Sequence, residues 1–184
     1  YGAGDLSALR RSIYVSLLLI GTVTILLNVA VFLWLDPILR WLQVPYDIYS
    51  LMRNYLWIIF WGIVFTFLYN FYAALLRAVG DSVTPLWFLA VSVVLNIGLD
   101  LFLILVLDQG IEGAAVATVI AQGTAASGIL LYTYKTRPEL RLHREDMCFD
   151  RSSLREITSF STLTCVQQSV MNFGILMVQG LVNS

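Results

Sequence analysis

The stretch LWFLAVSVVLNIGLDLFLILVL, residues 86–107, decides the fold class of this chain. A helix needs about 20 apolar residues to cross the hydrocarbon core of a bilayer, and this stretch is long enough. It also contains an amide, Asn96, and a single charged residue, Asp100. On insertion scales, an Asp at the centre of a membrane helix costs about 2.5–3.5 kcal/mol. Such a residue needs a compensating role.

The composition of the whole chain agrees with a membrane protein. Of its 184 residues, 59% are hydrophobic and 12% are charged, whereas a soluble domain carries about 25% charged residues. The charges separate four more apolar runs, at residues 13–35, 55–76, 113–134 and 157–182, of which the last is weaker because Ser, Thr and Gln occupy its first half. We therefore predict an all-α, polytopic helical bundle with five membrane helices. We interpret the chain as an internal piece of a larger membrane protein.

Several residues predict where these helices end or meet. Gly80 suits a left-handed cap after the second helix, and Thr84-Pro85 suits an N-cap and first turn for the third. In the tight turn DQGIEG, Gly110 and Gly113 act as helix breakers. The small residues of GAAVATVIAQGTAASG favour close helix packing, and Asn28 suits a hydrogen bond between helices.

The basic residues predict the orientation of the helices. Nine of the 11 Lys and Arg residues lie before the first helix, after the second, or between the fourth and fifth, and only Arg40 and Arg53 lie on the other side. The positive-inside rule places the nine in the cytoplasm. The third helix then runs outward and the fourth returns.

The composition gives little support to an enzyme. Intramembrane hydrolysis needs paired carboxylates, a Ser/His pair or a metal cluster. The chain has one Asp well inside an apolar run (Asp100), one His (His143) and two cysteines that are far apart in the sequence, Cys148 and Cys165. With a net charge of −1, it gives no indication of a nucleic-acid partner.

The spacing of polar residues predicts a cation site in the membrane. Asn96 and Asp100 share one helix face because they are four residues apart. At a rise of about 1.5 Å per residue, Asp100 and Thr118 both lie roughly 10 Å from the outer turn, and Asn96 and Gln122 match one turn deeper. Oxygen ligands of this kind suit hard cations, with Na+ as a candidate. A proton can take the same place, because burial disfavours the charged form of a carboxyl group.

The alternative for Asp100 is a hydrogen bond to a neighbouring helix that serves packing alone. Asn70 suits either a cavity or a bond to another helix. Gln167, Gln168 and Asn172 in the last helix are candidate contacts for a charged or aromatic substrate, and packing explains them equally well.

The motifs LLRAVGDSVTPLWF (75–88), NIGLD (96–100) and GAAVATVIAQ (113–122), in this order and spacing, resemble the multidrug and toxic compound extrusion (MATE) transporters. The likeness extends over nearly the whole chain and corresponds to the third to seventh of the family's twelve helices. This chain departs from the family's pattern in its last helix. Many members carry a Pro early in the seventh helix, and the corresponding segment SFSTLTCVQQS has none.

The resemblance implies two six-helix bundles around a central cavity. Residues 1–134 would form four helices of the N-terminal bundle, 135–156 a cytoplasmic connector, and 157–184 the truncated first helix of the C-terminal bundle. Asn96, Asp100 and Thr118 would match the cation-coupling site, with Asn70 beside it. A further Asp that the family places on its first helix would belong to the missing remainder of the transporter.

The implied function is an antiporter that exports small organic, often cationic, compounds in exchange for Na+ or H+. It would need no cofactor besides the coupling ion, and would lie as a multi-pass protein in a cell membrane, by resemblance the bacterial cytoplasmic membrane. Two alternatives remain open. A lipid-linked oligosaccharide flippase of the same superfamily would need a cationic cavity, yet no Lys or Arg enters a helix interior. A structural membrane scaffold would need none of the three polar residues.

Overall fold

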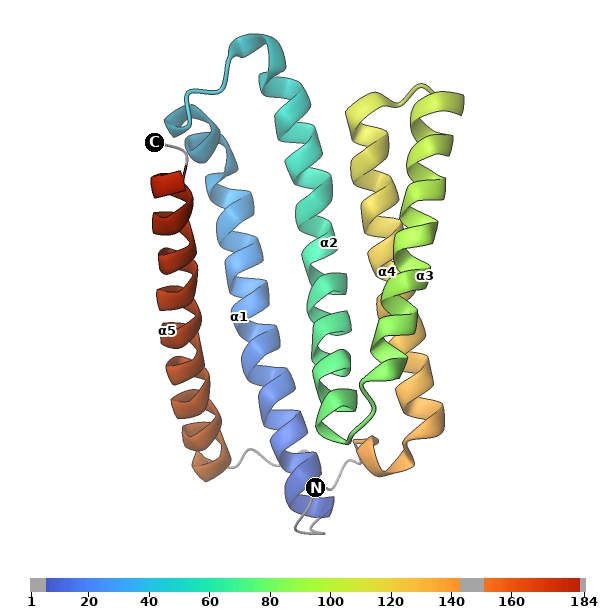
Figure 1. Ribbon diagram of the computed structural model, residues 1–184, viewed down its shortest axis with the longest axis vertical. Coiled ribbons are helices and arrows are strands. Elements are labelled where there is room, and N and C mark those ends of the chain that lie inside the picture. Colours follow the sequence, from blue (N-terminus) through green and yellow to red (C-terminus); the bar gives the residue numbers. More distant parts are fainter. Residues whose placement is uncertain (1–5, 143–150, 183–184) are drawn as a thin grey trace. The chain divides into compact units, whose positions relative to one another are not determined.

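The computed structural model describes residues 6–142 and 151–182, and every regular element in them is a helix (Figure 1). Four of the five predicted apolar runs lie within longer helices, because backbone hydrogen bonding continues into the flanking polar residues. The run 86–107 is instead divided between an α-helix and a π-helix and extends one residue beyond them. The elements are α1 (Leu6–Trp41), α2 (Tyr46–Ala78), α3 (Val83–Leu101), the π-helix η1 (Phe102–Val106), α4 (Gly110–Thr136), the short 3₁₀ helix η2 (Pro138–Leu140) and α5 (Arg151–Val182).

The chain divides into two compact units. The first contains Leu17–Arg141, and the second contains the start of α1 and α5. Helices occupy part of the segment predicted as a connector, 135–156, because α4 continues to Thr136 and α5 begins at Arg151.

Four of the described helices are long and apolar enough to cross a membrane: α1, α2, α3 together with η1, and α4. The prediction of a fifth spanning helix is not confirmed, because Ser, Thr and Gln lower the hydropathy of α5. Among the four, α4 is the most enclosed. It buries 33% of its most apolar stretch, against 11% for α2 and for α3.

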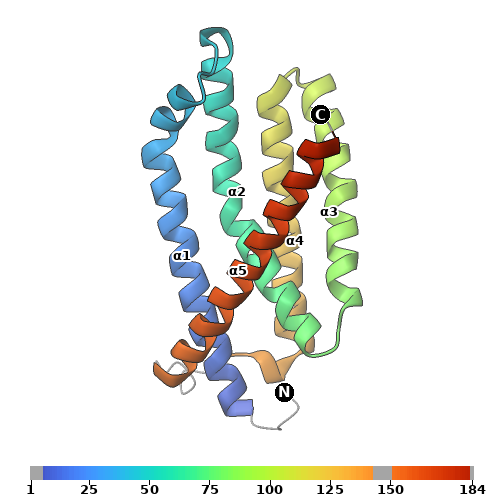
Figure 2. The same ribbon diagram turned by 60° about the vertical axis from the view of Figure 1, so that its left-hand side comes forward.

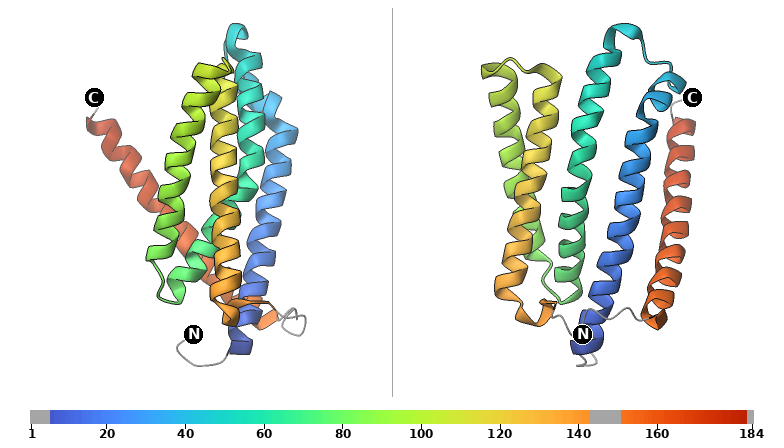
Figure 3. Two further views of the ribbon diagram at one scale, coloured as in Figure 1. Left: turned by 90° about the vertical axis from the view of Figure 1, so that its right-hand side faces the viewer. Right: turned by 180° about the vertical axis from the view of Figure 1, so that it is seen from behind.

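Helix α4 packs against α2 and α3 through small residues, as predicted (Figure 3). A Cβ atom added to Gly128 would lie 2.7 Å from the Phe88 ring of α3, and one added to Gly62 of α2 would lie 3.1 Å from Val119. These approaches leave no room for larger residues. The buried alanines of α4 are Ala115, Ala117, Ala121, Ala125 and Ala126.

The turn from α2 to α3 begins with a left-handed glycine. Gly80 has φ +88° and follows the C-cap of α2, which confirms its predicted role. The backbone N–H of Asp81 donates to Leu76 O (2.9 Å) and that of Gly80 donates to Arg77 O (3.1 Å). These two bonds form a Schellman motif and satisfy the last carbonyl groups of α2.

The predicted N-cap of α3 was wrong, because Asp81 caps this helix and Thr84 does not. The Asp81 carboxylate accepts hydrogen bonds from the Thr84 backbone N–H (3.1 Å) and hydroxyl (2.8 Å). Arg137, beyond the end of α4, lies 3.8 Å from the same carboxylate. The first turn of α3 is also held by α2, since the Tyr69 hydroxyl donates to Pro85 O (2.8 Å).

Figure 2 shows the turn that joins α3 to α4. This turn differs from the prediction at one glycine. The π-helix η1 ends α3, and α4 begins at Gly110, whose φ of +56° fits a breaker. Gly113 is instead a buried residue within α4, where an added Cβ would lie 3.1 Å from the Leu103 side chain. Its small size permits close packing and does not break the helix.

Helices α1 and α2 meet through one hydrogen bond and a group of aromatic rings. The Asn28 side chain donates to Phe60 O at 2.7 Å, which confirms its predicted role between helices. The Phe32 ring of α1 lies 5.7 Å from Trp57 and 5.8 Å from Trp61, measured between centroids.

Candidate functional site

The face of α3 that meets α4 contains two of the predicted cation-site residues, Asn96 and Asp100. The buried Ser92 hydroxyl donates to Ala121 O (2.9 Å). One turn further along α3, the Asn96 amide donates to the Thr118 hydroxyl oxygen at 3.4 Å. Further still, Leu103 contacts Gly113. This face of α3 is thus in contact with α4 over about three turns.

Asp100 lies on the same face, one turn beyond Asn96. Its Oδ1 atom is buried and has no hydrogen-bond partner among the described residues. A buried polar atom without a partner typically costs about 1–3 kcal/mol. The unsatisfied oxygen therefore distinguishes Asp100 among the polar residues of this interface.

The Thr118 hydroxyl is oriented by its own helix. It donates to Ala114 O at 2.9 Å, one turn earlier in α4. Because its proton is used in this way, its oxygen acts as an acceptor toward Asn96. Carboxylate, amide and hydroxyl oxygens on one helix interface are ligands that suit hard cations.

The predicted register between α3 and α4 was wrong by one turn. Asn96, and not Asp100, lies level with Thr118. The arithmetic assumed α-helical rise up to the turn, but η1 has i→i+5 bonding, as in Leu107 N to Phe102 O (3.2 Å), and so places more residues in each turn. Asp100 lies one turn nearer the α3–α4 turn than the Asn96–Thr118 pair, and η1 accounts for part of this difference.

The predicted match of Gln122 with Asn96 was also wrong. The Gln122 carbonyl oxygen accepts a hydrogen bond from the Thr66 hydroxyl of α2 at 2.8 Å. Asn70, also on α2, is exposed, and its amide donates to Thr66 O within the same helix (2.8 Å). No hydrogen bond among the described residues joins Asn70 directly to Asn96 or Thr118.

The candidate substrate contacts lie on α5, in the second unit. Gln167 and Asn172 are both exposed on this helix, as is Gln168.

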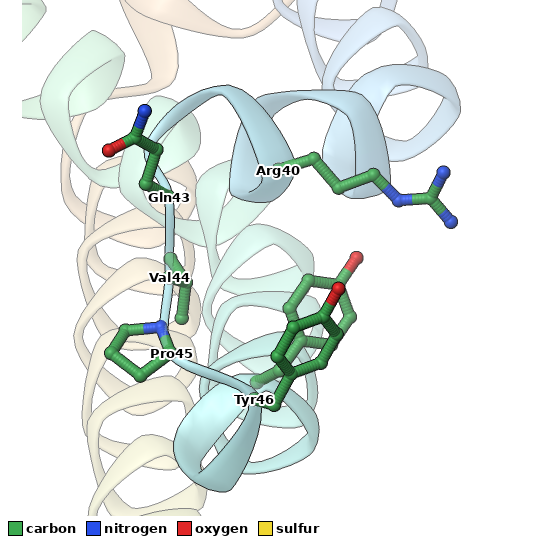
Figure 4. Close-up of a pocket in the computed structure, with 6 residues that line it drawn as sticks. Arg40, Gln43, Val44, Pro45 and Tyr46 are labelled. Carbon is green, nitrogen blue, oxygen red and sulfur yellow. The ribbon is translucent and has the colours of Figure 1, made fainter.

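A separate pocket lies at the α1–α2 turn (Figure 4). Its volume is about 620 Å³, and it contains none of the predicted site residues. Beside it, the Asp36 carboxylate accepts hydrogen bonds from Tyr49 (3.0 Å) and Arg53 (2.8 Å), which join α1 to α2. The lining residues are Arg40, Gln43, Val44, Pro45, Tyr46 and Tyr49.

Two residues at the α2–α4 interface were not predicted as a pair. Thr66 was not singled out in the sequence, and Gln122 was assigned to the wrong neighbour. A usable signal was present, because Gly62, Thr66 and Asn70 follow one another at four-residue spacing and therefore share one face of α2.

Comparisons with known proteins identify relatives of this chain. The family model MatE matches residues 1–102. "Probable multidrug resistance protein YpnP" of Bacillus subtilis (strain 168) is 40% identical over 134 residues, which are 73% of this chain and 30% of the relative. "Probable multidrug resistance protein NorM" of Thermotoga maritima is 32% identical over 135 residues, 71% of this chain and 29% of the relative.

A second B. subtilis protein, "Probable multidrug resistance protein YoeA", is 34% identical over 159 residues, 84% of this chain and 33% of that protein. The chain thus spans about a third of the length of the curated relatives it matches.

One solved structure is similar in fold. It is described as the inward-facing conformation of a multidrug resistance MATE family transporter of the MOP superfamily. The TM-score is 0.78 with 22% sequence identity, and the match covers 85% of this chain and 36% of that one.

Proposed function

Because the chain belongs to the MatE family, we propose that it is part of a secondary active antiporter that exports small organic, often cationic, compounds in exchange for Na+ or H+. The names of its relatives support multidrug efflux as the general activity. The complete protein would be a multi-pass protein of a cell membrane, and the bacterial relatives favour the cytoplasmic membrane of a bacterium.

The buried, unpartnered Oδ1 of Asp100 is the observation that supports ion coupling most directly. It lies on a helix long and apolar enough to span a membrane, one turn from the Asn96–Thr118 pair. A scaffold gains nothing from a buried oxygen without a partner, whereas a site for Na+ or H+ requires one. Asn96 and Thr118 are the proposed further ligands, and Asn70 a more distant contributor.

Coupling requires that the cation bind one conformation better than the other. A ligand shifts a conformational equilibrium only by its differential affinity for the two states. The proposed ligands belong to both α3 and α4, so cation binding would favour the state in which these helices hold Asp100 one turn from the Asn96–Thr118 pair. We propose that this state has the lower affinity for the exported compound, which Gln167 and Asn172 would contact in the complete protein.

The test is transport by the full-length protein in membrane vesicles, with Na+ and pH gradients imposed separately. The expected result is export of an organic cation driven by one of the two gradients and lost in the variant Asp100→Asn, at a normal amount of folded protein. Asp108→Asn is the matched control, because Asp108 is an exposed acid of the α3–α4 turn and its φ of +52° suits Asn. Undiminished export by Asp100→Asn would contradict the proposal.

A further inference from the structure

We infer that Thr66 and Gln122 are positioning residues of the cation site, which join the Asn70 face of α2 to the Asn96–Thr118 pair. This inference rests on the proposed function. It concerns the Thr66–Gln122 hydrogen bond at the α2–α4 interface, which includes none of the predicted cation ligands.

A series of polar contacts crosses three helices. Asn96 of α3 donates to Thr118 of α4, and Gln122 follows Thr118 by one turn on the same face. Gln122 accepts from Thr66 of α2, and the Thr66 carbonyl accepts from Asn70. The Thr66–Gln122 bond is therefore the step that connects the two halves of this series.

The contact lies where α2 and α4 approach closely. A Cβ atom added to Gly62, one turn before Thr66, would lie 3.0 Å from Gln122 Oε1. Among the described residues, the other side-chain hydrogen bond between these helices, Asn54 to Glu112 at 2.9 Å, lies at the start of both. Thr66–Gln122 is thus the polar contact between α2 and α4 at the depth of the proposed site.

Packing alone does not require this pair. Beyond Asn54–Glu112, the other described contacts between α2 and α4 include apolar ones: Gly62 approaches Val119, and Ala73, Leu76 and Ile129 form a buried cluster. A polar pair in a membrane interior loses its bond when its helices separate, so it favours one relative position of α2 and α4. Because Thr118 and Gln122 belong to the same helix one turn apart, a movement that displaces Thr118 relative to α2 also strains the bond to Thr66.

The test uses the full-length transporter in proteoliposomes, with two concentrations measured for each variant. One is the coupling-cation concentration for half-maximal export, and the other is the KM for the organic cation. For Thr66→Val we expect the first to rise at least threefold and the second to stay within twofold of wild type. Thr66→Ser, which keeps the hydroxyl, should restore the wild-type value.

The matched control is Thr124→Val. Thr124 is an exposed residue of α4 whose hydroxyl bonds only to the carbonyl of Ile120 in its own helix (2.8 Å). A merely structural contact would lower the thermal transition in detergent or change both concentrations together. Such a pattern, or behaviour of Thr66→Val equal to that of Thr124→Val, would overturn the inference.

A double-mutant cycle keeps the inference testable if one variant folds poorly. Gln122→Leu should raise the half-maximal cation concentration as Thr66→Val does, and the double variant should add little to either single one. Fully additive shifts would show that the two residues act separately. If Asp100→Asn abolishes coupling while these variants match Thr124→Val, only the positioning role fails; if Asp100→Asn exports normally, the proposed function itself fails.

Discussion

Four carboxylates of the first unit have an ion-pair or hydrogen-bond partner, and Asp100 differs from them. Asp36, Asp81, Glu112 and Glu139 lie within 4.0 Å of a cation or accept a hydrogen bond, from Arg53, Thr84, Asn54 and Arg137 respectively. Within the part of the chain that the structure describes, the buried oxygen of Asp100 has neither. Since an unsatisfied buried polar atom costs free energy in the folded state, a cation that binds there replaces a penalty with an interaction.

Thr118 provides a test of the ligand set that leaves Asp100 intact. Thr118→Val keeps the shape of the side chain but removes the oxygen that faces Asn96. We expect the coupling-cation concentration for half-maximal export to rise about tenfold, equivalent to about 1.4 kcal/mol. The measurement is cation-dependent export in proteoliposomes.

The control for Thr118 is Ser92→Ala at the same interface. Ser92 is buried and its hydroxyl bonds to Ala121 O, but it lies one turn from Asn96 on the side away from Asp100. Loss of such a bond between membrane helices costs about 0.6 kcal/mol on average, so it should leave the cation dependence nearly unchanged. Equal shifts in both variants would mean that Thr118 acts by packing alone.

The sequence predicted which polar residues lie at the α3–α4 interface better than it predicted their contacts. Asn96 and Asp100 share a face because of a local rule, four-residue spacing, and the tight turn made α4 the neighbour of α3. The contact of Gln122 with Thr66 depends on how α2 packs on α4, and no spacing within one helix contains that information.

At the scale of the elements, the α2–α3 turn contains the most polar contacts. Asp81 caps α3 and approaches Arg137 after α4, so one carboxylate joins three segments. The backbone N–H of Thr84 is the largest cause that lowers the pKa of Asp81, and the Thr84 hydroxyl and Arg137 lower it further. Burial acts in the opposite direction without reversing the shift.

This lowered pKa predicts a pH dependence of stability. The contribution of Asp81 is fully present above its pKa in the unfolded chain, about 3.9, and is lost as the pH falls through the lower pKa of the folded state. Asp81→Asn keeps an acceptor for the cap but removes the charge. Wild type should therefore be more stable than Asp81→Asn by a constant amount between about pH 5 and 7, and the difference should disappear on acidification below the unfolded pKa.

Thermal transitions of the detergent-solubilised full-length protein measure this difference. A stability difference between wild type and Asp81→Asn that stays constant down to about pH 2 would contradict an ionic role for Asp81.

The elements also show which features a sequence pattern predicts poorly. Gly80 was assigned correctly because a left-handed residue after a helix strongly favours glycine. The π-helix η1 has the same apolar composition as the α-helix it follows, so nothing in residues 102–106 distinguished the two. That irregularity accounts for part of the one-turn difference between the expected and the observed register of α3 on α4.

At the scale of the whole molecule, the distribution of basic residues connects orientation to mechanism. Nine of the 11 Lys and Arg residues belong to segments on one predicted side. The positive-inside rule makes that side cytoplasmic and places the α3–α4 turn outside. Asp100 lies one turn nearer this turn than the Asn96–Thr118 pair, so its carboxylate would belong to the outer half of the membrane.

Single cysteines in the full-length protein test this orientation. In a background with Cys148 and Cys165 replaced by Ser, Gln109→Cys in the α3–α4 turn and Ser82→Cys in the α2–α3 turn report on opposite ends of α3, and both positions are exposed. A membrane-impermeant maleimide should label Gln109→Cys in intact cells and Ser82→Cys only after permeabilisation.

The labelling result tests the proposed route of the coupling cation as well as the orientation of α3. Export driven by Na+ or H+ entry needs a site that loads from the side where the cation is abundant, which is the outside. An outward-facing α3–α4 turn puts the unpartnered Asp100 oxygen closest to that supply. Labelling of Ser82→Cys in intact cells, with Gln109→Cys protected, would place the Asp100 carboxylate nearer the cytoplasm. That result would contradict entry of the cation from the outside through the α3–α4 end of the helices.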